Sequence, residues 1–209
     1  KQVYEQVLSQ KGDYAPAHFS LSSIYLILGD YERGLNEYEW RWTAYHEKGE
    51  RFNCPVWRGE KFTGTLLVYA EQGLGDTLQF IRYLNLIKKQ YPAIKIAFEC
   101  QEALIPLLKK QPYIDQIFSR RHAPAQADYQ IPLMSLARIF NTRLDSIPAE
   151  IPYISVSEDL VKEWKQKLTS DQNLKIGLCW QGNGRYSTQA LRKAVAQKSI
   201  PLKQLAPLF

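Results

Sequence analysis

The spacing of hydrophobic residues divides the chain into two kinds of segment. In residues 1–42, apolar residues such as Leu21, Ile24 and Leu28 recur at the three- to four-residue interval of helices. From residue 65 onward they form short continuous runs separated by helical segments, which is typical of buried strands alternating with helices. This alternation predicts an α/β fold with a parallel, doubly wound sheet, preceded by helices.

The apolar runs also predict individual elements. We expect strands at "TLLVYA" (65–70), "IKIAFEC" (94–100), "IDQIFS" (114–119) and "ADYQIPL" (127–133). We expect helices at 77–91, 101–110 and 134–140. A crossover and helix at 151–168 and a strand in "LKIGLCWQGN" (174–183) then predict the start of a second α/β domain that is cut short. The expected domains are therefore 1–52 (helical), 53–156 (first sheet domain) and 157–209 (incomplete second domain).

Composition restricts the class of protein and its partners. The 209 residues include 45% hydrophobic and 23% charged side chains, which is ordinary for a globular protein. No apolar run approaches the length of about 20 residues that a membrane span requires, and the N-terminus carries no signal segment. The three cysteines are far apart, so we expect a reduced, cytoplasmic setting with no disulfide framework and no metal site.

The net charge of +6 falls mainly after residue 60. The basic residues are scattered on helices such as "KEWKQKL" and do not form a stripe interleaved with aromatic residues. We therefore expect a solvated face and no nucleic-acid partner. A small ligand that carries phosphate would suit the same sign of charge.

The stretch "AEQGLGDTLQF" (70–80) is the strongest candidate site, because two glycines and a carboxylate follow a buried strand. A dinucleotide fingerprint, which would make the protein a nicotinamide-dependent oxidoreductase, lacks its third glycine, since Leu78 stands there. Alternatively, Asp76 begins a helix as its N-cap, with Gln79 completing a capping box. In the third interpretation Asp76 is a general base at the carboxyl edge of the sheet.

The glycines help to choose between these interpretations. A cap alone does not explain two glycines, which imply positive φ or the close approach of another group. Arg82, six residues further on, would help to hold an anion in the third interpretation, although exposure to solvent is the simpler expectation for it. From spacing alone, Asp76 remains a cap, a catalyst or both.

Several motifs together resemble one family. They are Trp57-x-Gly59, Glu71–Asp76, Gln79-Phe80, Arg82-Tyr83, Pro132-Leu133, Ser135-Leu136, Pro152-Tyr153, "IGLCWQGN" and "KSIPLKQLAPL". The chain resembles bacterial tetratricopeptide-repeat proteins that bear a glycosyltransferase-like domain, related to heptosyltransferases and to O-linked N-acetylglucosamine transferases. Gly29, Tyr31, Gly34 and Tyr38 fall on the small and aromatic positions of such a repeat.

The resemblance implies a GT-B type glycosyltransferase with two facing Rossmann-like domains, one for the acceptor and one for the nucleotide-sugar donor. It implies Asp76 as the catalytic base and an inverting transfer of the sugar to a hydroxyl acceptor on a protein or glycan, with no cofactor. The implied substrate-binding residues are Gln72, Gly73, Gly75, Gln79 and Arg82. The implied donor-binding residues are Trp180, Gly182, Asn183, Lys198 and Ser199.

An alternative function is a protein-interaction module without catalysis. In it, the helical repeats bind a protein partner through a groove that offers Tyr14, Tyr25 and Trp42, and the transferase domain is degenerate. Since most of the donor domain is expected to lie beyond Phe209, the chain by itself is expected to be inactive in either case.

Overall fold

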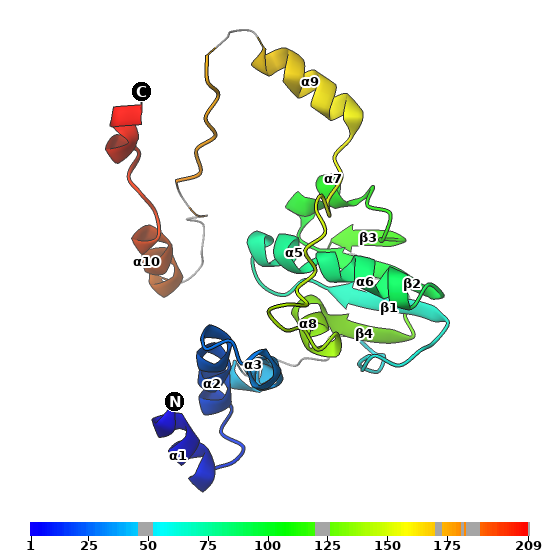
Figure 1. Ribbon diagram of the computed structural model, residues 1–209, viewed down its shortest axis with the longest axis vertical. Helices are drawn as coiled ribbons and strands as arrows, with labels where there is room; N and C mark the ends of the chain where they lie inside the picture. Colours follow the sequence, from blue (N-terminus) through cyan, green and yellow to red (C-terminus); the bar gives the residue numbers. More distant parts are fainter. Residues whose placement is uncertain (46–51, 120–125, 170–172, 181, 183–188, 209) are drawn as a thin grey trace. The chain divides into compact units, whose positions relative to one another are not determined.

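The computed structural model describes residues 1–45, 52–119, 126–169, 173–180, 182 and 189–208 (Figure 1). The chain divides into two compact units, Lys1–Val156 and Ser157–Phe209. The first unit holds both the N-terminal helices and the sheet. The second holds helices α9 and α10 and the short helix η3.

The first unit begins with four helices: α1 (Gln2–Gln10), α2 (Ala15–Ile27), α3 (Tyr31–Tyr38) and α4 (Arg41–Ala44). The expected tight turn joins α2 to α3. Gly29 adopts φ +80°, and the Asp30 side chain caps α3 by accepting a hydrogen bond from the Arg33 amide at 3.2 Å. The two helices pack closely because Gly34 has no side chain. A Cβ atom at this position would lie only 2.7 Å from Leu26 Cγ.

Four parallel strands form the sheet: β1 (Gly64–Tyr69), β2 (Ile94–Cys100), β3 (Gln116–Ser119) and β4 (Tyr129–Pro132). Their order is β3-β2-β1-β4, so β1 is central and pairs with both β2 and β4. The four apolar runs of this region therefore form strands as the sequence predicted, and the unit is an α/β fold with a parallel sheet.

Helices connect and follow the strands. They are α5 (Leu74–Phe80), α6 (Arg82–Gln90), the short η1 (Glu102–Leu104) with α7 (Ile105–Leu108), and η2 (Leu133–Ser135) with α8 (Leu136–Ile139). The single helix predicted at 77–91 is wrong in two respects. It begins at Leu74, because Gly73 and not Asp76 is the N-cap, and it is interrupted at Ile81, whose carbonyl accepts from the Leu84 amide only three residues on.

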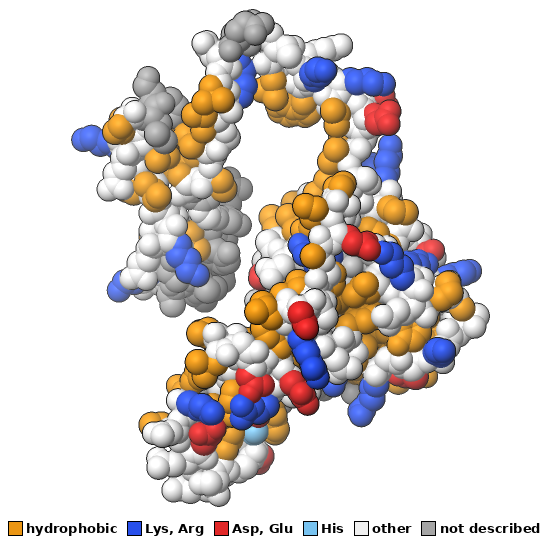
Figure 2. Space-filling model, in the orientation of Figure 1, with side chains coloured by type: hydrophobic (Ala, Val, Ile, Leu, Met, Phe, Trp, Pro, Cys, Tyr) orange, Lys and Arg blue, Asp and Glu red, His pale blue; other side chains and the backbone are white. Residues whose placement is uncertain are grey.

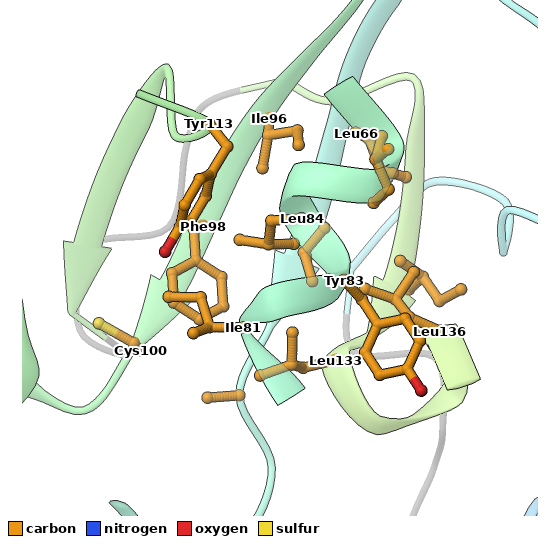
Figure 3. Close-up of a cluster of buried hydrophobic side chains, with 14 of the residues drawn as sticks. Leu66, Ile81, Tyr83, Leu84, Ile96, Phe98, Cys100, Tyr113, Leu133 and Leu136 are labelled. Carbon is orange, nitrogen blue, oxygen red and sulfur yellow. The ribbon is translucent and has the colours of Figure 1, made fainter. Parts of the chain in front are cut away.

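The main core lies between one face of the sheet and helices α5 and α6 (Figure 3). Leu66 and Phe98 of the strands pack there with Ile81 and Leu84, and all four are fully buried. Strand residues alternate between faces, so Tyr69 points to the opposite side of the sheet.

The N-terminal segments help to bury that second face. The Tyr69 ring lies 6.4 Å from the Trp42 ring and 5.7 Å from the Phe52 ring, measured between centroids. Tyr69 is consequently fully buried. The segment before β1 thus packs on the sheet and belongs to the same compact unit.

The second unit contains α9 (Glu158–Leu168), α10 (Gln189–Gln197) and η3 (Leu202–Leu208). The strand predicted at 174–183 is not formed over the described residues of that range. A strand needs a hydrogen-bonded neighbour, and the described part of this unit contains no other strand. Four apolar side chains of α9 are about half exposed: Leu160, Val161, Trp164 and Leu168. Hydrophobic side chains accordingly show on the surface of this helix in Figure 2.

None of the helices in the described ranges combines the length and the apolar character that crossing a bilayer requires.

Candidate functional site

The strand order places a topological switch point at β1. The chain passes from β1 to β2 on one side, whereas β4 pairs with β1 on the other side. Parallel sheets bind ligands beyond the carboxyl ends of the strands that flank such a point. Here those ends lead into the Ala70–Gly73 loop after β1 and into η2 after β4.

Asp76 lies in the first turn of α5, directly beyond this loop. Its Oδ2 atom accepts a hydrogen bond from the Gly73 amide at 2.8 Å. Asp76 is therefore the third residue of the helix reaching back to the N-cap, and the prediction that it is itself the N-cap is wrong. Its side chain is partly buried, and among the described residues no group donates a hydrogen bond to Oδ1.

The two glycines of the loop have different surroundings. Neither Gly73 nor Gly75 has positive φ, so that part of the expectation is wrong. A Cβ atom at Gly73 would lie 3.2 Å from Asp76 Oδ2, so the close approach there is made by the chain's own carboxylate. A Cβ atom at Gly75 would meet no heavy atom within 4 Å. Gly75 therefore leaves open space beside Asp76 that the fold itself does not need.

The loop is anchored to the neighbouring strand by Gln101, which follows β2. The Gln101 Nε2 atom donates to the Gln72 carbonyl at 2.9 Å, and its Oε1 accepts from Thr77 Oγ1 at 2.9 Å. Thr77 is buried on α5. The Gln101 side chain therefore ties both the loop and the start of α5 to the end of β2.

Arg41 of α4 anchors the same loop from the other side. Its Nε and Nη2 atoms donate to the two carboxylate oxygens of Glu71 at 2.8 and 2.9 Å, and Nη2 also donates to Ser135 Oγ at 2.9 Å. The Arg41 side chain is only 3% exposed and that of Glu71 7%. Although burial alone lowers the pKa of Arg41, its hydrogen bonds and charge pairing with Glu71 raise that pKa above the usual value.

Arg41 therefore joins the N-terminal helices to the ends of both strands at the switch point. Glu71 follows β1 and Ser135 follows β4, and the guanidinium contacts both. Glu39 completes the cluster, with Oε1 accepting from Arg41 Nη1 at 3.0 Å and from Ser135 Oγ at 2.9 Å. A buried, bidentate pair of this kind holds the loop in a fixed position.

Tyr38 at the end of α3 is a further contact to the loop. Its hydroxyl accepts from Gln72 Nε2 at 2.5 Å and points toward Met134 Sδ at 3.7 Å. Burial raises the pKa of the Tyr38 phenol, although the nearby positive charge of Arg41 acts to lower it. Tyr38 thus ties the end of α3 to the loop through Gln72.

Sequence reasoning missed Arg41, Gln101 and, as a site residue, Tyr38. Tyr38 was assigned to a repeat position, while Arg41 and Gln101 belong to no motif. Each contacts the loop across 28 to 34 positions of sequence. The acidic Glu71 directly after an apolar strand was the available signal, because a buried carboxylate needs a partner.

Gln79 and Arg82 lie further along the chain and face a different space. The Arg82 Nε atom donates to the Gln79 carbonyl at 2.9 Å and Nη1 to the Pro148 carbonyl at 2.6 Å, while the guanidinium lies 4.2 Å from the centre of the Tyr153 ring. The expectation that Arg82 is solvent-exposed is therefore wrong. Both residues line a cavity of about 450 Å³ whose lining does not include Asp76.

Four of the predicted donor-binding residues lie in the described part of the second unit. The Trp180 carbonyl accepts from the Ile200 amide at 2.9 Å, and the Gly182 amide donates to Ser199 Oγ at 3.4 Å. The structure thus brings Trp180, Gly182 and Ser199 together, with exposed Lys198 next in sequence. Asn183 lies outside the described residues.

The aromatic groove proposed for a protein partner is not formed as expected. Tyr25 is only 6% exposed and donates its hydroxyl hydrogen bond to Glu5 at 3.1 Å. Trp42 packs on Tyr69 of the sheet. Of the three residues, Tyr14 alone is exposed, because the other two serve packing within the first unit.

No group of three or more His, Cys, Asp or Glu side chains in the described ranges is arranged to hold a metal ion. The site as described consists of the Asp76 carboxylate, the Glu71 and Glu39 carboxylates paired with the buried Arg41 guanidinium, and several amide groups.

Comparison with known proteins adds one similarity. The chain is 24% identical over 188 residues to Protein FlbA from Caulobacter vibrioides, and the match covers 80% of this chain and 32% of FlbA. The chain thus spans less than half of that protein's length. No protein-family model matches the chain, and no solved structure matches it.

Proposed function

We propose that this chain is the N-terminal portion of an inverting glycosyltransferase of the GT-B type: tetratricopeptide-like helices, the acceptor-side domain and the start of the donor domain. Asp76 takes the proton from an acceptor hydroxyl, which then attacks the anomeric carbon of a nucleotide sugar and displaces the nucleoside diphosphate. The proton passes to the carboxylate, and the electron pair of the broken C–O bond leaves with the diphosphate.

One observation carries the proposal: an open carboxylate oxygen beside an open glycine at the switch point of a parallel sheet. Asp76 uses Oδ2 for the Gly73 amide and leaves Oδ1 for another partner. The space beside Gly75 suits a sugar ring or another acceptor group approaching the backbone. Ligands of parallel sheets bind at this edge, and the motif resemblance of the sequence points to the same reaction class.

The donor side of the proposal rests on Trp180, Gly182 and Ser199 together with Lys198. The Gly182 amide donates to Ser199 Oγ at 3.4 Å, and the Ser199 hydroxyl donates to the Val195 carbonyl at 2.8 Å. A donor phosphate would accept from these two groups in place of their present partners. Lys198 supplies a positive charge suited to the leaving diphosphate.

The full gene-encoded protein, incubated with a panel of UDP-, GDP- and ADP-sugars and assayed for nucleoside diphosphate release, tests this function. We expect release from one donor class and its loss in Asp76→Asn. Glu102→Gln, which neutralises an exposed carboxylate after the neighbouring strand, is the matched control and should retain release.

A second candidate is the interaction module without catalysis. The buried Arg41–Glu71 pair favours it, because the chain's own guanidinium lies between the two strand ends where a ligand binds in many parallel sheets. Folded protein that releases no diphosphate from any donor would support this candidate and reject transfer.

A further inference from the structure

A cavity in the first unit is separate from the Asp76 loop. It measures about 450 Å³ and lies between the N-terminal helices and the helices on the sheet. Leu26 and Leu35 line it on one side, and Phe80 and Tyr83 line it on the other. This volume lies in the range of small-molecule sites, about 300–1,000 Å³.

The cavity offers flat apolar walls. The rings of Phe80 and Tyr83 lie with centroids 6.0 Å apart and planes inclined by 22°. The Tyr83 hydroxyl already bonds Thr142 Oγ1 at 2.8 Å, so this part of the wall presents its ring and not an unsatisfied polar group. Tyr31 adds a third aromatic residue to the lining.

One cation, Arg82, is fixed in this wall. Among the described residues, its guanidinium donates hydrogen bonds to the carbonyls of Gln79 and Pro148 and rests on the Tyr153 ring. These neutral groups hold the side chain in place but do not cancel its charge. Within the described residues Arg82 forms no ion pair, unlike Lys88 and Lys89 on the same helix.

We propose that this cavity binds a small molecule with a flat apolar body and one anionic group. The aromatic and leucine side chains would cover the apolar body, and Arg82 would pair with a carboxylate, sulfonate or phosphate. A neutral amphiphile would leave the charge of Arg82 uncompensated, whereas an anionic one is complementary to it.

This site does not depend on the proposed sugar transfer. Its lining excludes Asp76, and the test below measures binding alone. Failure of the probes to bind would not contradict the proposed sugar transfer, and failure to transfer sugar would not contradict this binding site.

The probe pair for the test is 8-anilinonaphthalene-1-sulfonate, an aromatic anion, and N-phenyl-1-naphthylamine, a neutral molecule of similar shape. Fluorescence titration of the folded full chain should show saturable binding of the anion to one site. In Arg82→Gln we expect the Kd of the anion to rise at least about tenfold, with little change for the neutral probe. Lys89→Gln, which removes a cation from the same helix outside the cavity, should change neither.

A second variant keeps the test decisive if Arg82→Gln unfolds. Ile147 lines the cavity and is 37% exposed, so Ile147→Trp can be accommodated while it narrows the space. It should weaken both probes and leave the circular dichroism spectrum unchanged. Two results would overturn the proposal. One is no saturable binding of the anion to the folded chain. The other is an affinity for the anion that equals that of the wild type in the folded Arg82→Gln and Ile147→Trp variants.

Discussion

The two oxygens of the Asp76 carboxylate have separate surroundings. Oδ2 stabilises the first turn of α5 through the Gly73 amide, and Oδ1 remains available. A single residue can therefore serve the fold and the chemistry together. This division also explains why the spacing "GLGD" alone did not separate a cap from a catalyst.

Gly75 gives a test at the residue scale. It occupies the first turn of α5, where its added Cβ meets nothing within 4 Å and its φ is not positive. Because glycine is a poor helix former, we expect Gly75→Ala to increase the free energy of unfolding by about 0.5–1 kcal/mol. Urea unfolding followed by circular dichroism measures this change.

Gly73→Ala is the matched comparison. Its Cβ would lie 3.2 Å from Asp76 Oδ2 and would disturb the bond that starts the helix. We expect this variant to be less stable than the wild type. A Gly75→Ala protein that is destabilised as much as Gly73→Ala would show that the open space beside Asp76 is needed by the fold.

The sequence predicted the Gly73–Asp76 region as the site but not the internal geometry. The N-cap is a glycine, which has no side chain to mark a helix start, so the pattern pointed to Asp76 instead. The Arg41–Glu71 pair spans 30 positions, so the acidic Glu71 after a buried strand signals that a partner is needed but does not identify Arg41 as that partner. Contacts of this kind follow from tertiary packing and not from spacing along the chain.

At the scale of elements, Arg41 links α4 to the loop after β1. Removing it would leave the Glu71 carboxylate buried at 7% exposure without its bidentate partner. We expect Arg41→Ala to lower the free energy of unfolding by about 3–5 kcal/mol, as for other broken buried pairs. Denaturant unfolding of the full chain measures the loss.

The double variant Arg41→Ala with Glu71→Gln controls for the unpaired charge. It should be more stable than Arg41→Ala alone, because glutamine is neutral. A surface ion pair contributes less than about 1 kcal/mol to the free energy of unfolding. If Arg41→Ala loses no more than this, Arg41 does not form a rigid junction between the helices and the loop.

The segment that follows α8 is anchored by another buried group. The Tyr113 hydroxyl donates to the Tyr153 carbonyl at 2.7 Å, and burial raises the pKa of Tyr113 to about 12. An unfolded tyrosine has a pKa of about 10, so the folded state holds this proton more tightly. The resulting stabilisation is complete below pH 10 and is lost as the pH rises through 12.

We therefore expect Tyr113→Phe to show a smaller fall in stability than the wild type between about pH 10 and 12. Urea midpoints at several alkaline pH values test this, with Tyr45→Phe, which changes an exposed tyrosine, as the control. If the urea midpoints of the wild type and Tyr113→Phe fall equally between about pH 10 and 12, the Tyr113 phenol is not the group that causes the loss of stability.

Elements with strong local patterns were predictable, and those that depend on partners were not. The run Leu66–Tyr69 reads as a strand and is one, because neighbours on both sides pair with it. The run at 174–180 has a similar apolar composition but lacks a strand to pair with in the described part of its unit. Periodicity detects the tendency to form a strand and not the presence of its neighbour.

At the scale of the whole molecule, stability is concentrated in the first unit. Every buried hydrophobic residue of the described chain lies before residue 157. We expect residues 1–156 alone to unfold in one cooperative transition with the urea midpoint of the full chain. We expect residues 157–209 alone to show no cooperative transition, because they bury no comparable core.

Circular dichroism of the two fragments and of the full chain provides the comparison. A marked fall in the midpoint of residues 1–156 would mean that the second unit contributes to the stability of the first. That outcome would contradict the division of the chain at Val156.

The central claim is that Asp76 is a general base placed at the switch point of the sheet. The most direct measurement is the rate of sugar transfer by the full gene-encoded protein carrying Asp76→Asn, with its unfolding free energy determined on the same sample. Asparagine retains an oxygen for the Gly73 amide but cannot take a proton, so we expect a rate loss of at least about 100-fold with stability nearly unchanged. Transfer within about threefold of the wild type in a stable Asp76→Asn protein would contradict the claim and leave Asp76 a helix cap.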